Sequence, residues 1–180
     1  MHRTALTLFL ATTGGLSLAA QTRPTGTEQQ VHADMNQLMR GVLYPAANVV
    51  FSAQGDNPAE IKLPPGHDPN MSTDPLTSTF GGWTAVENAA LALAESANLL
   101  AIEGRRCSTG VVAPTNDPVW AGFARDMRAA SLKAHAGAKA KDQQQMIEVA
   151  DELSATCTGC HRRFRDRRPP GVRCTLPETK

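Results

Sequence analysis

Apolar residues recur at steps of three and four along four stretches of the chain, which is the spacing of amphipathic helices. The expected helices span residues 29–53, 83–103, 117–137 and 142–167. The last stretch is the most regular, with apolar or sulfur-bearing side chains at Met146, Val149, Ala150, Leu153, Cys157, Cys160 and Phe164. No stretch shows the alternation typical of a β-strand, so the pattern predicts an all-α fold.

Proline and glycine mark the boundaries of these helices. Residues 53–82 contain five prolines and form a long predicted loop, whereas the other connections are short. We expect an antiparallel four-helix bundle, although so long a loop would also let the first two helices run parallel. Pro45 lies inside the first helix, where its ring would crowd the carbonyl of Gly41, so we expect a kink or a break there.

The first twenty residues have the organisation of a secretory signal peptide. A short basic start at His2 and Arg3 precedes an apolar run that ends in small residues at Ala19 and Ala20. A membrane anchor would need roughly 20 strongly apolar residues, and this run is interrupted. The expected organisation is a signal peptide at 1–20, a linker at 21–28, a helical domain at 29–168 and a tail at 169–180.

Composition and charge narrow the class of protein. The formal net charge is +1, so no overall positive charge indicates a nucleic-acid partner. No segment after the leader could span a bilayer, so we expect no stable membrane insertion. A cleaved signal peptide places the mature protein in the periplasm or outside the cell, in an oxidising compartment.

A Cys-x-x-Cys-His sequence runs from Cys157 to His161, near the end of the last predicted helix. This sequence is typical of c-type haem attachment, in which each thiol adds to a porphyrin vinyl group and the histidine binds the iron. A redox dithiol would be expected at a helix N-terminus in a βαβ setting. A zinc site would need a fourth ligand and better convergence than one helix offers. We therefore predict one covalent haem c on Cys157 and Cys160, with His161 as proximal iron ligand.

The second axial ligand is expected upstream of the motif, because none of the nineteen residues after His161 is Met or His. Met35 and Met39 lie four residues apart on one face of the first helix, from which a thioether could reach the iron. Methionine on an apolar helix face is usually core packing. If neither residue binds, the iron is five-coordinate, with an apolar pocket open to a small gas.

The pattern as a whole resembles the class II cytochromes c, the group of cytochrome c′ and cytochrome c556. The segment CTGCHRRFR, residues 157–165, is similar to the haem segment of that group. Residues 38–51, 95–106 and 116–127 are similar to one bacterial branch of it. The resemblance implies a four-helix bundle that carries its haem on the last helix, although the long loop and Pro45 depart from the group's pattern.

The resemblance also implies a function. Methionine in the first helix implies a six-coordinate electron carrier, and Met39, within the Leu-Met element, is the better match, with Met35 second. An apolar residue there would imply a five-coordinate protein that binds NO or CO. We expect a periplasmic monohaem electron carrier with redox proteins as partners and no enzymatic activity, while a homodimer remains open.

Two cysteines and a run of arginines are left over. In an oxidising compartment Cys107 and Cys174 can form a disulfide that ties the tail to the bundle, the alternative being two free thiols. Six arginines and one acid lie between Arg162 and Arg173. Charge runs are usually solvated, and the alternatives are pairing with haem propionates or attraction of an acidic redox partner. A third class of function, a helical interaction module held by zinc or a disulfide, would need no haem.

Overall fold

The computed structural model describes residues 29–166 and residue 174. The regular secondary structure of these residues is helical, with no β-strand. The α-helices are α1 (Met35–Leu38), α2 (Tyr44–Gly55), α3 (Trp83–Leu100), α4 (Pro118–Ala140) and α5 (Gln143–His161). Two π-helical turns, η1 (Met39–Leu43) and η4 (Arg162–Asp166), and two 3-10 turns, η2 (Pro69–Met71) and η3 (Pro75–Thr77), complete the fold. The predicted all-α fold is confirmed. The expected signal peptide, the linker and most of the expected tail lie outside the described residues.

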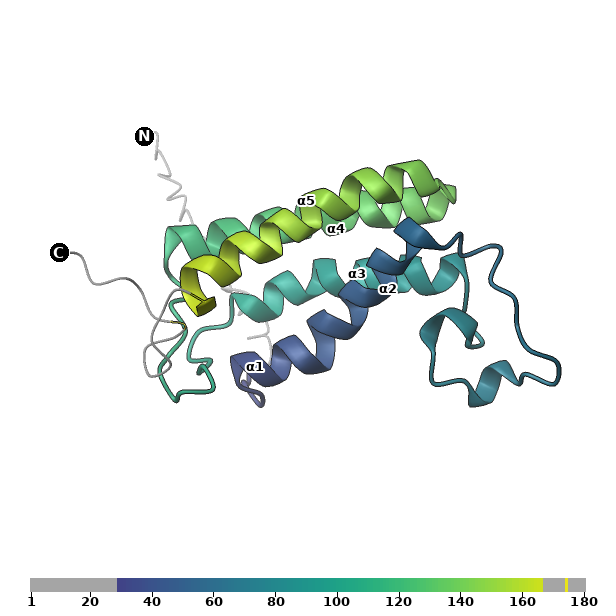
Figure 1. Cartoon of the computed structure of the whole chain (residues 1–180). Helices are drawn as coiled ribbons and strands as arrows, with labels where there is room; N and C mark the ends of the chain where they lie inside the picture. Colours follow the sequence, from purple (N-terminus) through teal and green to yellow (C-terminus); the bar gives the residue numbers. More distant parts are fainter. Residues whose placement is uncertain (1–28, 167–173, 175–180) are drawn as a thin grey trace, which may run out of the picture.

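The helices form a four-membered bundle (Figure 1). The segments α1, η1 and α2 make one continuous rod, and α3, α4 and α5 are the other three members. Helix α2 packs against α3 and α5, and α4 packs against the same two helices, so the four form a closed ring. The chain direction reverses from each helix to the next, so the long loop does not make the first two helices parallel. Within the described residues, no helix is both long and apolar enough to cross a bilayer.

The first helix starts later than its apolar pattern predicts. Asp34 is the N-cap, and its side chain accepts a hydrogen bond from the Gln37 backbone N–H at 2.8 Å. The Gln37 side chain accepts in return from the Asp34 N–H at 2.9 Å, which completes a capping box. The prediction of helix from residue 29 was therefore wrong by about one and a half turns, because this cap fixes the start at Met35.

Pro45 does not break the helix. The chain forms the π-helical turn η1 just before it, in which the Tyr44 N–H donates to the Met39 carbonyl, five residues back. A proline has no N–H to donate, and its ring crowds the carbonyl four residues earlier. A π-helical turn is wider than an α-helical one, and we attribute the continuity of the helix to this widening.

The ends of the other helices follow their capping chemistry. Asp117 and Asp142 are the N-caps of α4 and α5, so both helices begin where the apolar pattern predicts. Helix α3 ends at Leu100, not at residue 103, and α4 runs past Gly137 to Ala140. Two side chains donate hydrogen bonds to the last carbonyls of α3. Arg105 Nε donates to the Leu99 carbonyl at 3.2 Å, and Trp120 Nε1 donates to the Leu100 carbonyl at 3.0 Å. These bonds satisfy acceptors that a helix end otherwise leaves open.

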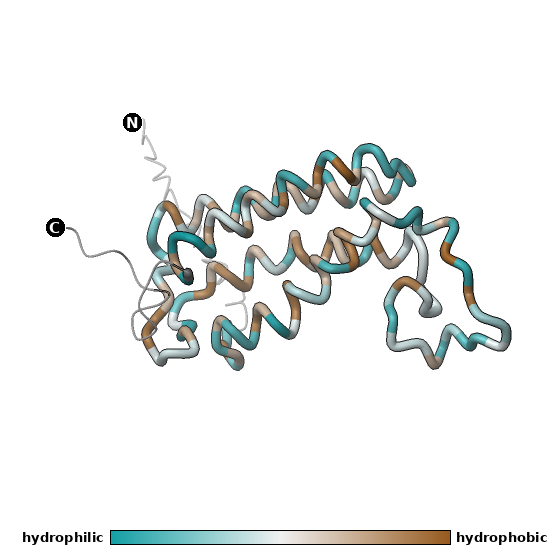
Figure 2. The backbone as a smooth tube through the Cα atoms, in the orientation of Figure 1, coloured by the Kyte–Doolittle hydropathy of each residue, from teal (hydrophilic) through white to brown (hydrophobic). Residues whose placement is uncertain are grey.

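The core is built largely from alanine and aliphatic side chains. Leu93, Met146 and Leu153 are among its largest fully buried side chains, and Met127 is 4% exposed. Met146 is thus the core residue that its spacing predicts, and Met127 is buried in the same core. Apolar positions recur along each helix between polar ones (Figure 2), so each helix contributes one face to a shared core.

The long loop lies at the end of the bundle opposite the Cys-x-x-Cys-His motif (Figure 1). It carries η2 and η3, and each of these turns is capped by an aspartate, Asp68 and Asp74. His67 is half-buried, and its Nε2 lies 2.8 Å from the Thr77 carbonyl oxygen. The loop is therefore ordered by local hydrogen bonds and stands apart from the motif.

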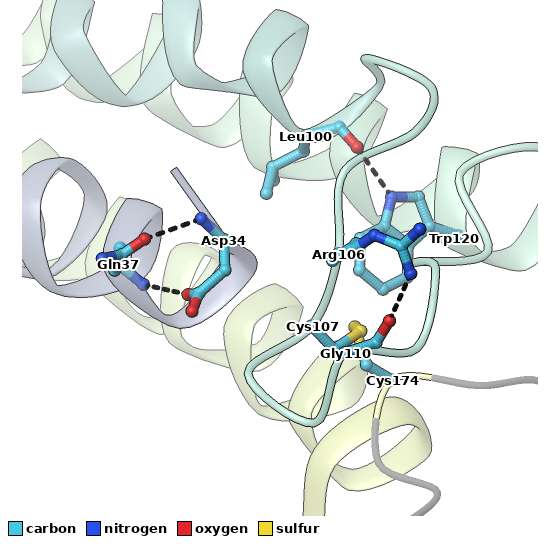
Figure 3. Close-up of a disulfide and its surroundings, with 8 residues drawn as sticks. All are labelled: Asp34, Gln37, Leu100, Arg106, Cys107, Gly110, Trp120 and Cys174. Atoms are coloured by element: carbon cyan, nitrogen blue, oxygen red, sulfur yellow. Dashed lines mark hydrogen bonds between the residues drawn. A yellow bond between two sulfur atoms is a disulfide. The ribbon is translucent and has the colours of Figure 1, made fainter. Parts of the chain in front are cut away.

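A disulfide joins Cys107, in the connection between α3 and α4, to Cys174 (Figure 3). The two α-carbons are 6.0 Å apart, and both residues are buried. The Cys174 backbone N–H donates to the Phe164 carbonyl, so the bond also fixes residue 174 under the end of α5. Of the two alternatives, the structure has the disulfide and not two free thiols.

Replacing both partners, Cys107→Ser with Cys174→Ser, is expected to lower the free energy of unfolding by about 2–4 kcal/mol, because the bond closes a long loop in the unfolded chain. Urea unfolding measures the loss. Dithiothreitol should lower the wild-type protein to the level of the double variant and leave the variant unchanged. Equal stability of the two proteins under oxidising conditions would contradict a structural role for the bond.

Candidate functional site

The Cys-x-x-Cys-His motif occupies the last turns of α5, which stays helical through His161. Cys157 and Cys160 are half-buried free thiols that pack against the apolar core, and His161 is half-exposed at the helix end. In an unbroken helix, residues three and four apart share a face. Cys160 and His161 therefore each lie about one helical turn after Cys157, at neighbouring positions of α5.

The environment of the thiols favours their protonated form. Burial raises the pKa of Cys160 from its ordinary value of 9.0 to about 12, and the nearby Cys157 adds to the rise while Arg165 opposes it. Burial also raises the pKa of Cys157, against the effect of a backbone hydrogen bond. A redox dithiol reacts through its thiolate, so this environment does not favour a reactive dithiol.

The geometry gives no further support to a zinc site. Within the described residues, no three His, Cys, Asp or Glu side chains are grouped so that they could hold a metal ion.

Gly159, between the two cysteines, is in contact with α4. A β-carbon at this position would lie 2.7 Å from Cε1 and 3.1 Å from Cζ of Phe123. The Phe123 ring therefore lies directly against the backbone of the motif, at a separation that only glycine permits. The sequence gives no signal of this contact, because a glycine within the motif does not show which side chain faces it.

The candidate distal ligands differ in position. Met35 is buried, at 7% exposure, while Met39 is half-buried and packs at the margin of the same apolar core that Cys157 and Cys160 contact. Met39 is also the first residue of the π-helical turn η1. Met71 is 79% exposed in the distant loop. Among the methionines that the structure describes, Met39 is thus set apart by its place on the core margin.

The first and last helices separate toward the motif end of the bundle. Helix α5 packs closely on α2, whereas η1 packs on α3 and makes no comparable contact with α5. Figure 1 shows α1 and the end of α5 at the same end of the bundle, on different sides of it. Met35 and Met39 therefore lie on the helical rod that neighbours α5, at the end of the bundle where the two helices separate.

Aromatic side chains close this end of the bundle. Trp120 is 5% exposed, and its ring centroid lies 5.0 Å from that of Phe164 in an edge-to-face arrangement. Phe164 is itself buried and holds Cys174 through its carbonyl. Trp120 is thus part of the packing that supports the end of α5.

A buried cation, Arg105, ties the first helix to this end. Its guanidinium donates from Nη1 to the Ala33 carbonyl at 2.6 Å as well as to Leu99, and the residue is only 4% exposed. Burial lowers the pKa of Arg105. The sequence shows this arginine only as one of two after a helix, so its structural role was not predicted.

Comparisons of the chain with protein-family models, with curated proteins and with solved structures find no match. The resemblance to class II cytochromes c therefore rests on the motif, its place on the last helix and the helical bundle.

Gly159→Ala is expected to lower the free energy of unfolding by about 1–3 kcal/mol, because the added methyl group overpacks against Phe123. Chemical unfolding in urea measures the change. Gly41→Ala is the matched control, since no atom lies within 4 Å of a β-carbon there, and it should be neutral or slightly stabilising. Adding Phe123→Ala to Gly159→Ala should remove the clash. Wild-type stability of Gly159→Ala would show that the contact is not tight.

In the chain made without haem and kept reduced, iodoacetamide at pH 8 is expected to modify Cys160 at least about tenfold more slowly than in the urea-unfolded chain, since only the thiolate reacts. The unfolded chain releases this proton near pH 9 and the folded chain near pH 12. The stability of the haem-free chain should therefore fall as pH rises through that interval. Equal alkylation rates in folded and unfolded chains would refute the burial of this thiol.

Proposed function

We propose that this protein is an exported monohaem c-type cytochrome that carries single electrons. The observation that carries the proposal is the placement of Cys157, Cys160 and His161 on one face of the last helix of a four-helix bundle, with both thiols against the apolar core. The resemblance to cytochrome c556 and cytochrome c′ supports the same proposal, because that group carries its haem on the last helix.

The donor set fits haem c. Two free thiols one turn apart can each form a thioether with a vinyl group, and an addition of S–H across a double bond needs no oxidant. Half-buried apolar surroundings would suit a large apolar ring, and the adjacent His161 would supply an imidazole as an iron ligand. When bound, the haem supplies a one-electron ferric/ferrous couple, whose potential depends on axial ligands and burial.

The side chains that pack around the motif have positioning roles in this proposal. Phe123 holds the backbone of the motif at Gly159, and Trp120 with Phe164 keeps water from the end of the core. The disulfide and the Arg105 hydrogen bonds join α1, the connection after α3 and the end of α5. Together these contacts fix the relative position of the helix that carries the motif and the helix that carries the candidate distal ligand.

Met39 is the proposed distal ligand. It lies at the margin of the core that the two thiols contact, whereas Met35 is enclosed in that core. A thioether ligand opposite His161 would give a six-coordinate, low-spin iron and raise its potential. If Met39 only packs, the iron is five-coordinate, and the protein would instead bind NO or CO.

Production in a host able to attach c-type haem tests the proposal. The purified protein should be red and keep its colour in denaturing gels, and the paired change Cys157→Ser with Cys160→Ser should abolish that retained colour. A colourless wild-type protein loaded with zinc would contradict the proposal and favour a helical interaction module.

Met39→Leu is expected to convert the ferric spectrum from low-spin to high-spin, because leucine keeps the apolar volume and removes the sulfur. Met35→Leu is the matched control and should leave the spectrum low-spin. A conversion by Met35→Leu alone would assign the ligand to Met35. A wild-type spectrum that is already high-spin would favour the gas-binding alternative.

A further inference from the structure

The long loop between α2 and α3 forms an ordered lobe beyond the end of the bundle that lies opposite the motif (Figure 1). Residues 56–82, which we call the lobe, contain only the short turns η2 and η3. Hydrogen bonds join its distant parts: Thr79 Oγ1 donates to the Asn70 side chain at 2.8 Å, and the Gly82 N–H donates to the Leu76 carbonyl at 2.8 Å. A loop of this length in a compact domain usually has a function of its own.

Two glycines fix the shape of the lobe where it returns to the bundle. A β-carbon on Gly81 would collide with the Leu76 carbonyl oxygen and would lie 2.9 Å from the Ser78 carbonyl oxygen. Gly82 has a φ angle of 60°, in the left-handed region that favours glycine. The chain can therefore double back closely on residues 76–78. A surface that is already ordered in this way loses less conformational entropy when a partner binds.

The lobe exposes large apolar side chains. Leu63, Met71 and Phe80 are 47%, 79% and 67% exposed. Met71 and Phe80 each directly follow one partner of the Asn70–Thr79 hydrogen bond, so this bond brings two apolar positions together. Apolar side chains that gather on the surface of a small domain mark interaction sites.

A groove of about 280 Å³ lies in the same lobe. Its apolar lining is made by Pro58, Ile61, Leu63 and Leu76. Small-molecule sites typically have volumes of about 300–1,000 Å³, so this groove suits an apolar side chain of a partner better than a cofactor. We call the groove, together with Leu63, Met71 and Phe80, the lobe face.

The lobe is acidic, and its charge is not cancelled nearby. The exposed carboxylates of the lobe are Asp56, Glu60, Asp68 and Asp74, and its exposed cation is Lys62. None of these five side chains forms an ion pair within the part of the chain that the structure describes. The helix ends at this end of the bundle carry Glu87, Asp142 and Glu148 and the lysines Lys139 and Lys141. Seven carboxylates thus stand against three lysines at this end.

Two of the carboxylates border the groove. Glu60 directly precedes Ile61, and the Asp74 carboxylate accepts a hydrogen bond from the Leu76 N–H at 3.0 Å. Ile61 and Leu76 both line the groove. Lys62 adds one positive charge beside them, which leaves the border acidic. An apolar groove with this border is complementary to an apolar side chain that has basic neighbours.

We propose that the lobe face docks a segment of another protein in which an apolar side chain is flanked by lysine or arginine. The apolar side chain enters the groove, and its basic neighbours meet the carboxylates beside it. Because the lobe lies at the end of the bundle opposite the motif, this contact leaves the candidate site uncovered. The inference goes beyond the proposed electron-carrier function and does not depend on it.

Other occupants fit the lobe face less well. An anionic bilayer and a nucleic acid would both be repelled by the acidic lobe. A symmetric dimer through this face would bring two acidic lobes together, because the same patch of each copy meets its counterpart. A basic, apolar segment of a different protein meets neither objection.

The test selects random dodecapeptides displayed on phage against the purified full chain with its disulfide intact. The selected peptides should carry Leu, Ile, Phe or Met next to Lys or Arg, and fluorescence polarisation measures their dissociation constants. Leu63→Ser with Phe80→Ser should weaken their binding about tenfold or more. Glu60→Gln with Asp74→Asn should act in the same direction, since it removes charge and keeps side-chain oxygens that can accept the local hydrogen bonds.

Matched controls make the same changes on the helices. Leu132→Ser with Ile147→Ser alters side chains that are 49% and 40% exposed on α4 and α5, and Glu148→Gln with Asp151→Asn removes two exposed charges from α5. Both controls should bind the selected peptides as wild type does. Salt should weaken binding to wild type more than binding to Glu60→Gln with Asp74→Asn. Circular dichroism should show the same helix content in all five proteins.

Several results would overturn the proposal. These are the selection of no peptide, equal affinity of the selected peptides for all five proteins, and selected peptides without basic residues that Glu60→Gln with Asp74→Asn still binds. Binding of phosphatidylcholine vesicles in place of peptides, lost in Leu63→Ser with Phe80→Ser, would overturn it in favour of a lipid surface. Wild-type dimers that the same variant abolishes, without peptide binding, would identify a second copy as the occupant.

Discussion

The candidate site depends on one constraint: a single unbroken helix, α5, both packs against the core and carries the motif. Met146 and Leu153 fix its inner face in the bundle, and the same face continues into Cys157 and Cys160. The direction of the two thiols therefore follows from core packing. Contact between Phe123 and Gly159 keeps α4 against the backbone at that point, so the motif is held by the packing of a neighbouring helix as well as by its own.

Contacts at the motif end of the bundle also fix the position of the first helix. Arg105 hydrogen-bonds Ala33 just before the α1 cap, and Cys107, two residues later, is bonded to Cys174 beneath Phe164. The Arg105 hydrogen bond and the disulfide thus link α1 to the end of α5, and these are the two helices that would hold a bound haem. A site formed by residues far apart in sequence needs such links, because its geometry is only as fixed as the elements that carry it.

Periodicity and capping residues predicted much of this fold. The aspartates before α4 and α5 act locally, and the apolar stripes are a property of each helix alone, so both can be recognised in sequence. The start at Asp34 was missed although its reciprocal cap with Gln37 is just as local. The π-helical turn before Pro45 and the end of α3 at Leu100 could not be recognised, since they depend on a wider turn and on the distant Trp120 side chain. The motif itself was visible, but its contact with Phe123 arises only when α4 and α5 pack.

The central claim is that Cys157 and Cys160 hold a haem covalently, and intact-mass spectrometry tests it most directly. For protein from a host with c-type haem attachment, the account predicts one chain heavier by the mass of one haem, with the added mass on the peptide that contains both cysteines. A chain of unmodified mass, with those two residues as free thiols or joined to each other, would contradict the account.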